Sequence, residues 1–218
     1  MQLRQLFTLI RKDLLLEWRQ KHTLLGVTLY VGCTVFVLYM MAGQPDSRIW
    51  NTLFWIAQLF VTVNTVAKSF LQEGESRMRY YFTLVPPVLY ILAKMAYSMV
   101  MMMVMMCLSL LLFTLLLGSP IIHMRSFVGV CCLGASSLSL LFTFLSAIAA
   151  QARQNAALMA ILGFPIAIPL LMILSNLALS SVASVTQEGW WSMAFLMLGM
   201  DVLIVALAVI LFPFLWKE

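Results

Sequence analysis

The chain has 218 residues, of which 63% are hydrophobic and 10% are charged, and its mean hydropathy is +1.02. Soluble globular domains average about 45–50% apolar and about 25% charged residues. So few charges exclude a soluble globular domain, and disorder is excluded because it requires low hydrophobicity. We therefore expect an integral membrane protein. At about 20 residues a span, the chain holds six spans and leaves no room for a soluble catalytic domain.

The net charge of +5 comes from 13 Lys and Arg against 8 Asp and Glu. In a membrane protein this excess reflects basic residues on the cytoplasmic side, so we expect no nucleic-acid partner. The four cysteines lie in apolar runs without CxxC spacing, which indicates packing residues and not a disulfide framework or a zinc site: Cys33, Cys107, Cys131 and Cys132.

Residues 1–22 form an amphipathic pattern. At 100° a residue, one face carries Leu3, Leu6, Phe7, Ile10, Leu14 and Trp18, and the opposite face carries Arg4, Arg11, Lys12 and Arg19. This predicts a basic helix lying along an anionic membrane surface. The alternative is the charged start of a signal peptide, against which stand the long apolar run that follows and the lack of a cleavage site.

Six apolar segments follow, each long enough to cross a bilayer: 24–42, 49–69, 90–117, 126–150, 157–179 and 191–216. Gly43-Gln44-Pro45-Asp46 indicates a turn between the first two. The predicted fold is an all-α integral membrane protein. It is a single membrane domain over residues 1–218, with six transmembrane helices after an N-terminal interfacial helix.

Basic residues predict the orientation. With the N-terminus in the cytoplasm, eleven of the thirteen lie inside and only Arg48 and Arg125 lie outside, which favours cytoplasmic N- and C-termini. The tryptophans lie near the ends of the predicted spans, as an aromatic belt at the membrane interfaces requires: Trp18, Trp50, Trp55, Trp190, Trp191 and Trp216.

Motifs for enzyme chemistry are missing from the sequence. Lys68-Ser69 is the one Lys followed by Ser or Thr, and no glycine precedes it as a phosphate-binding loop requires. There is no HExxH and no GxSxG motif. We therefore expect no catalytic residue, no bound metal and no cofactor held by this chain, and no ATP hydrolysis through a phosphate-binding loop.

The longest predicted cytoplasmic loop, 70–89, is dense in charge. It favours a short amphipathic helix ended by Pro86-Pro87 that docks a soluble partner, and its candidate docking residues are Glu73, Gly74, Glu75, Arg77 and Arg79. The alternative is an ordinary solvated loop.

A basic first helix, six spans and a charged loop between spans two and three resemble the permease subunits of ABC-2-type exporters. The fifth span carries a P-x-x-I-P-L-L pattern from Pro165, and Pro86 is followed by Leu92-Ala93-Lys94. Together these resemble the haem exporter protein B family (CcmB) of cytochrome c maturation. The loop departs from the family, because it reads Glu75-Ser76-Arg77-Met78 where a Gly-Ser/Thr-Leu-Glu stretch is frequent.

The resemblance implies a membrane subunit that works with a separate ABC ATPase, a haem-handling membrane protein and a periplasmic haem chaperone in the bacterial inner membrane. ATP hydrolysis in the partner would drive haem export or release of the haem-loaded chaperone, with haem as the handled ligand. Six spans make a half-transporter, so a second copy of the chain is also an expected partner.

Three features inside or beside the spans are candidate functional residues. Pro165 and Pro169 each remove a backbone donor and bend the fifth span, as a hinge or as a static kink. Asp201 lies ten residues after Trp191, about 15 Å deep, near the midplane. Such an acid has a mechanistic or subunit-contact role, or makes a neutral hydrogen bond, with Asn64, Gln58 or Asn176 as partners.

His123 and Arg125 lie together in a predicted outer loop, where they are candidates for an axial haem ligand and a propionate partner. A lone loop histidine more often has no such role. Three other functions stay open: an ABC-2 permease exporting a lipid, glycan or drug, an assembly scaffold without transport, and a small intramembrane enzyme.

Overall fold

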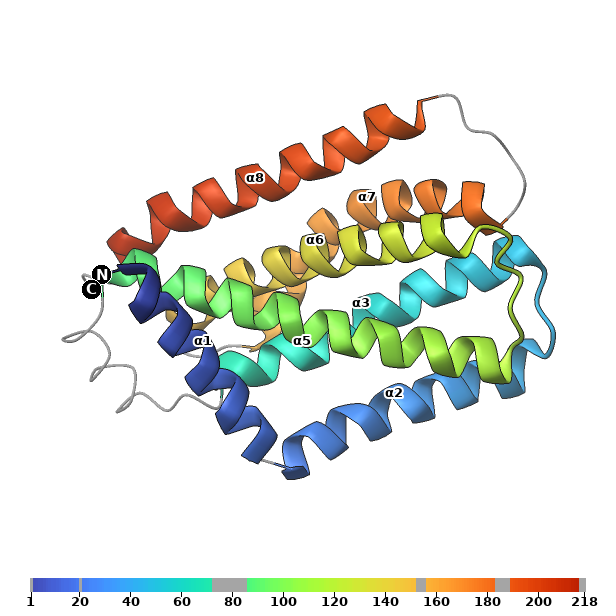
Figure 1. Cartoon of the computed structure of the whole chain (residues 1–218), viewed down its shortest axis with the longest axis horizontal. Helices are drawn as coiled ribbons and strands as arrows, with labels where there is room; N and C mark the ends of the chain where they lie inside the picture. Colours follow the sequence, from blue (N-terminus) through green and yellow to red (C-terminus); the bar gives the residue numbers. More distant parts are fainter. Residues whose placement is uncertain (1, 20, 72–85, 152–155, 183–188, 216–218) are drawn as a thin grey trace.

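The computed structural model describes residues 2–19, 21–71, 86–151, 156–182 and 189–215. Within these ranges the fold is all-helical, and six of its helices are long and apolar enough to cross a membrane, which confirms the predicted fold class. The helices are α1 Gln2–Arg19, α2 Lys21–Ala42, α3 Ser47–Leu71, α5 Pro87–Leu116, α6 Met124–Gln151, α7 Ala156–Val182 and α8 Trp190–Leu215 (Figure 1).

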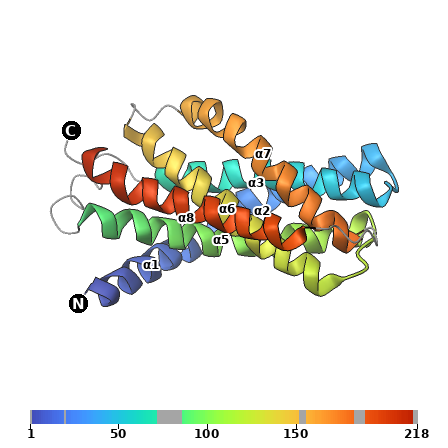
Figure 2. The ribbon, with the colours of Figure 1, turned by 90° about the horizontal axis from the view of Figure 1, so that it is seen from above.

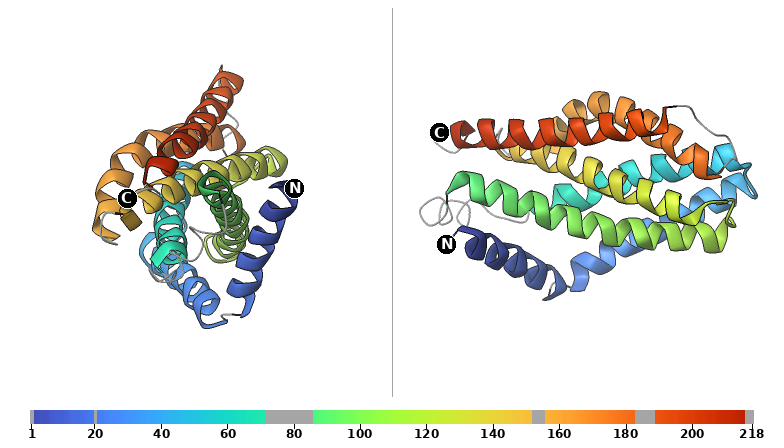
Figure 3. Two further views of the ribbon diagram at one scale, coloured as in Figure 1. Left: turned by 90° about the vertical axis from the view of Figure 1, so that its left-hand side faces the viewer. Right: turned by 45° about the horizontal axis from the view of Figure 1, so that its top comes forward.

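The six long helices run along one axis, and α1 packs obliquely at one end of them (Figures 1 and 2). The start of α5 and the end of α8 lie at this same end, which we call the α1 end. α6 is the central helix and contacts α3, α5, α7 and α8, while α2 packs at the side against α3 and α5 (Figure 3).

Small residues explain how α6 comes to lie at the centre. A Cβ atom added at Gly134 would lie 2.5 Å from Cζ3 of the buried Trp55 of α3. At the next interface, a Cβ atom at Gly163 of α7 would lie 2.7 Å from Cε1 of Phe142 of α6. Helices in membranes associate through such close packing, because lipid offers no hydrophobic drive between them.

The turns follow the local sequence. The predicted turn between the first two spans contains Gly43, whose φ of 62° favours glycine, and Gly118 after α5 has φ of 78°. Pro86 precedes α5 and Pro87 begins it, as expected where a proline has no N–H for the helix to satisfy.

Aromatic side chains fill the end of the bundle opposite α1. Trp50 stacks on Phe54 at 5.5 Å between ring centroids, and both rings meet Phe113 and Phe127. The indole of Trp50 donates a hydrogen bond to the Gly118 carbonyl at 3.1 Å. We call Trp50, Phe54, Phe113 and Phe127 the aromatic cluster.

This packing corrects one prediction. Trp50 and Trp55 are 0% and 1% exposed, so they lie between helices and do not belong to an aromatic belt facing the membrane interface. Trp50 is close to the start of its span, but its ring turns inward to the other aromatic rings. Trp191 is 71% exposed and keeps the position that an interfacial anchor requires.

Candidate functional site

The N-terminal helix is attached to α5 by charged and polar side chains. Lys94 Nζ lies 3.5 Å from Asp13 Oδ2, and the hydroxyl of Tyr97 donates to Glu17 Oε2 at 2.9 Å. Lys12 Nζ also lies 2.9 Å from Asp13 Oδ1. Asp13 and Glu17 are four residues apart on α1, and their partners are three apart on α5, so each pair shares one helix face.

This contact changes the interpretation of α1. The amphipathic pattern predicts an apolar face against the membrane, and Leu14 does pack against the core. Phe7 of the same predicted face is 70% exposed, however, whereas Asp13 is buried. The helix therefore packs on α5 through a mixed face, which the basic and apolar periodicity alone did not reveal.

The candidate docking residues Glu73, Gly74, Glu75, Arg77 and Arg79 lie outside the described residues. The structure places what flanks them: α3 ends at Leu71 and α5 begins at Pro87. Lys94 stands only two turns into α5. The contact between α1 and α5 thus lies close along the chain to the predicted docking loop.

Asp201 of α8 is buried, with 7% of its surface exposed. The hydroxyl of Ser136 lies 3.5 Å from its Oδ2, and Oδ1 has no hydrogen-bond partner among the described residues. Two of the three partners expected from the sequence are not paired with Asp201 in the described part of the chain. Asn64 donates to the Phe60 carbonyl of its own helix at 3.3 Å, and the buried Gln58 amide makes no hydrogen bond in the described part of the chain.

The residues that sequence reasoning missed are hydroxyls on α6. Four lie at positions i, i+3, i+7 and i+10, which places them on one helix face, and all are buried: Ser136, Ser139, Thr143 and Ser146. We call them the hydroxyl stripe. Its spacing is readable in the sequence, although hydropathy alone predicts only an apolar span there.

Pro165 and Pro169 lie inside α7, which continues as a helix through both of them. Both are exposed on the surface of the bundle. Between α3 and α7 lies a shallow groove of about 300 Å³, lined in part by Thr52, Ile168 and Asn176. Behind it Asn51 donates to the Ser175 carbonyl at 2.8 Å and holds α3 against α7.

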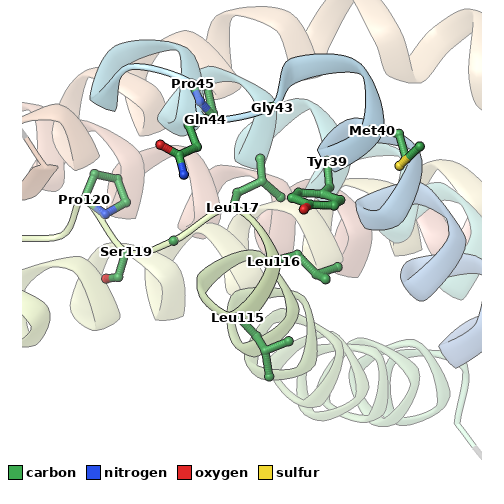
Figure 4. A pocket seen from close by; sticks show the side chains of 11 residues that line it. Tyr39, Met40, Gly43, Gln44, Pro45, Leu115, Leu116, Leu117, Ser119 and Pro120 are labelled. Carbon is green, nitrogen blue, oxygen red and sulfur yellow. The ribbon is translucent and has the colours of Figure 1, made fainter.

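A wider hollow of about 840 Å³ lies at the end opposite α1, between the turn after α2 and the turn after α5 (Figure 4). Tyr39, Met40 and Gln44 line one side, and Leu115 to Pro120 line the other. His123 and Arg125 are both exposed and are not part of its lining. The described residues contain no group of His, Cys, Asp and Glu that could hold a metal ion.

These features define a multi-span helical membrane protein with a helix docked at one end and polar side chains buried inside the bundle. The chain matches the family model described as CcmB protein over residues 4–215, so it belongs to the haem exporter protein B family. No curated protein matches it significantly. The family is the membrane permease component of a haem-exporting ABC system in cytochrome c biogenesis, and the permease subunit is not itself catalytic.

Proposed function

We propose that this chain couples ATP hydrolysis in a separate ABC ATPase subunit to haem export or to release of a haem-loaded chaperone. The observation that carries the proposal is the contact between α1 and α5. Lys94 and Tyr97 attach α1 through Asp13 and Glu17, only two to three turns after the start of α5. A force applied to the preceding loop is transmitted to both helices together.

We infer the partners from membership of the family. The ATPase docks on the loop through Glu73, Gly74, Glu75, Arg77 and Arg79, and a second copy of the chain completes the transporter. A haem-handling membrane protein and a periplasmic chaperone act at the opposite end. Haem is the handled ligand and ATP is bound by the partner, so this chain itself needs no cofactor.

We place the chain in the bacterial inner membrane with both termini in the cytoplasm. Six spans return the chain to the side on which it starts, and α5 begins and α8 ends at the α1 end. Eleven of the thirteen basic residues lie on this side in the proposed orientation, as the positive-inside rule requires.

Deletion of the gene in its host tests the function. We expect loss of covalently haem-stained c-type cytochromes, restored by the intact gene. Normal cytochromes in a host without a second maturation route would overturn the proposal.

Docking is tested by charge reversal, Glu73→Lys with Glu75→Lys, and co-purification of the ATPase. We expect the yield of bound ATPase to fall. Asp46→Lys is the control for reversing an exposed acid outside the loop, because Asp46 lies in the turn at the opposite end of the bundle. Its charge change is half that of the double variant. Equal amounts of ATPase co-purified with the wild type, the double variant and Asp46→Lys would contradict docking on this loop.

A further inference from the structure

Asp201 is the only acid in the described spans α2, α3, α5, α6, α7 and α8. One of its carboxyl oxygens has no hydrogen-bond partner among the described residues, and the other reaches Ser136 only at 3.5 Å. Carboxyl groups inside a membrane are costly and usually face a bundle interior or a hydrated cavity. Asp201 faces the interior, which leaves its charge state and its missing partner to be explained.

The hydroxyl stripe begins beside this carboxyl and runs toward the α1 end. Ten residues separate Ser136 from Ser146, which is about 15 Å along the helix axis. That distance is half of the roughly 30 Å hydrocarbon thickness of a bilayer. The hydroxyl stripe therefore reaches from the middle of the bundle to the margin of the membrane at the α1 end. Thr143, wholly buried at its centre, has an oxygen without a hydrogen-bond partner in the described part of the chain.

Toward the other end, the same face of α6 has no hydroxyl for two turns. It carries Leu133, Cys132 and Gly129, which lie three, four and seven residues before Ser136. Farther across the bundle at that end, the aromatic cluster packs ring against ring. Among the described residues of this α6 face, hydroxyl groups thus lead from Asp201 toward the α1 end, and none follows in the two turns toward the other end.

The helices that pack against α8 carry few other ionisable groups that compete with Asp201 for a proton. On α6 the nearest are Cys132 and Cys131, four and five residues before Ser136, and on α5 they are Tyr90, Lys94, Tyr97 and Cys107. Lys94 is occupied with Asp13 at the α1 end. The described part of α7 has no ionisable side chain, and α8 has none besides Asp201.

We propose that Asp201 is a proton-binding site that exchanges its proton with the α1 end of the bundle through water held along the hydroxyl stripe. A hydronium ion gives its proton to Oδ1 of the carboxylate and leaves as water, and the reverse step returns it. A serine or threonine hydroxyl that donates to its own helix still accepts a hydrogen bond from water through its oxygen. The hydroxyl stripe therefore orders a single file of water molecules. The proposal holds whatever the permease exports.

The test uses infrared spectroscopy of the full-length protein in lipid, where the C=O stretch of a protonated carboxyl is separate from the carboxylate bands. We expect an acid band that titrates with pH and disappears in Asp201→Asn. The absence of any band specific to Asp201 at every pH tested would overturn the proposal, as would an Asp201 band that does not change with pH.

The route is tested by the rate at which this band shifts after mixing with D₂O. We expect Thr143→Val to slow the shift about tenfold, the factor that one ordinary hydrogen bond contributes. Ser109→Ala is the matched control and should leave the rate unchanged, because Ser109 is equally buried but donates to the Met105 carbonyl, off the stripe. Equal rates in wild type and Thr143→Val would overturn the route.

Access from one side is tested in proteoliposomes of a single orientation, verified by protease access to a C-terminal tag. A pH change on the α1 side should titrate the band within the mixing time, and a change on the opposite side should not. The reverse pattern, or titration from both sides, would contradict the inference. A band that responds to sodium at constant pH would identify a cation site in its place.

Discussion

Lys94 Nζ and Asp13 Oδ2 lie 3.5 Å apart across 81 residues of sequence, and both side chains are less than one-tenth exposed. A buried ion pair of this kind is a weak source of net stability, because desolvation offsets most of the attraction. It is a strong determinant of geometry, because either charge left alone is costly. The pair fixes where α1 sits on α5.

Breaking this pair should destabilise the protein. We expect Lys94→Met and Asp13→Asn each to lower the free energy of unfolding on the order of 3 kcal/mol, since each leaves a buried charge with fewer partners. The double variant should lower the free energy of unfolding by much less than the sum of the two single effects. Unfolding in mixed detergent and dodecyl sulfate micelles measures this coupling. Arg11→Met, at an exposed position on α1, is the control, and additive costs in the double variant would contradict the prediction.

Gly134 should tolerate no side chain. An added Cβ atom would lie 2.5 Å from the Trp55 ring, and that ring is buried and held by a hydrogen bond from Nε1 to Asn51. We expect Gly134→Ala to cost about 1–3 kcal/mol of unfolding free energy, as overpacking does. Gly129→Ala is the control on the same helix, because nothing lies within 4 Å of its added Cβ atom.

A second substitution separates overpacking from a change in helix propensity. Trp55→Phe shortens the opposing ring, so it should recover part of the loss in the Gly134→Ala background. If Gly134→Ala lowers the unfolding free energy equally in the wild type and in the Trp55→Phe background, the contact with Trp55 is not the cause of the loss.

The sequence predicts the spans well because the length of an apolar run is a local property. It does not predict which face of α1 packs, since Asp13 and Glu17 find their partners about 80 residues away on α5. For the same reason Trp50 and Trp55 fit an aromatic belt by position, although their rings turn into the bundle. The hydroxyl stripe is different, because its spacing stands in the sequence and only its relation to Asp201 requires the fold.

Asn51 should hold α3 against α7. It donates to the Ser175 carbonyl at 2.8 Å and accepts from Trp55 Nε1 at 3.1 Å. We expect Asn51→Leu to lower the unfolding free energy by about 2 kcal/mol, since interhelical hydrogen bonds in membranes contribute about 0.6–2 kcal/mol each and the indole N–H loses its acceptor. Asn64→Leu on the same helix is the control, because Asn64 bonds its own backbone. Equal effects of the two changes would count against this role.

The two prolines of α7 should matter for coupling and not for assembly. Both are exposed, so Pro165→Ala with Pro169→Ala leaves the packed face unchanged while it restores two backbone donors and stiffens the helix. We expect normal insertion and normal ATP hydrolysis by the associated ATPase, with reduced haem-stained c-type cytochromes. Pro45→Ala, in the turn before α3, is the control for loss of a proline as such. Wild-type cytochrome levels in the double variant would show that the bends are static and play no part in transmission.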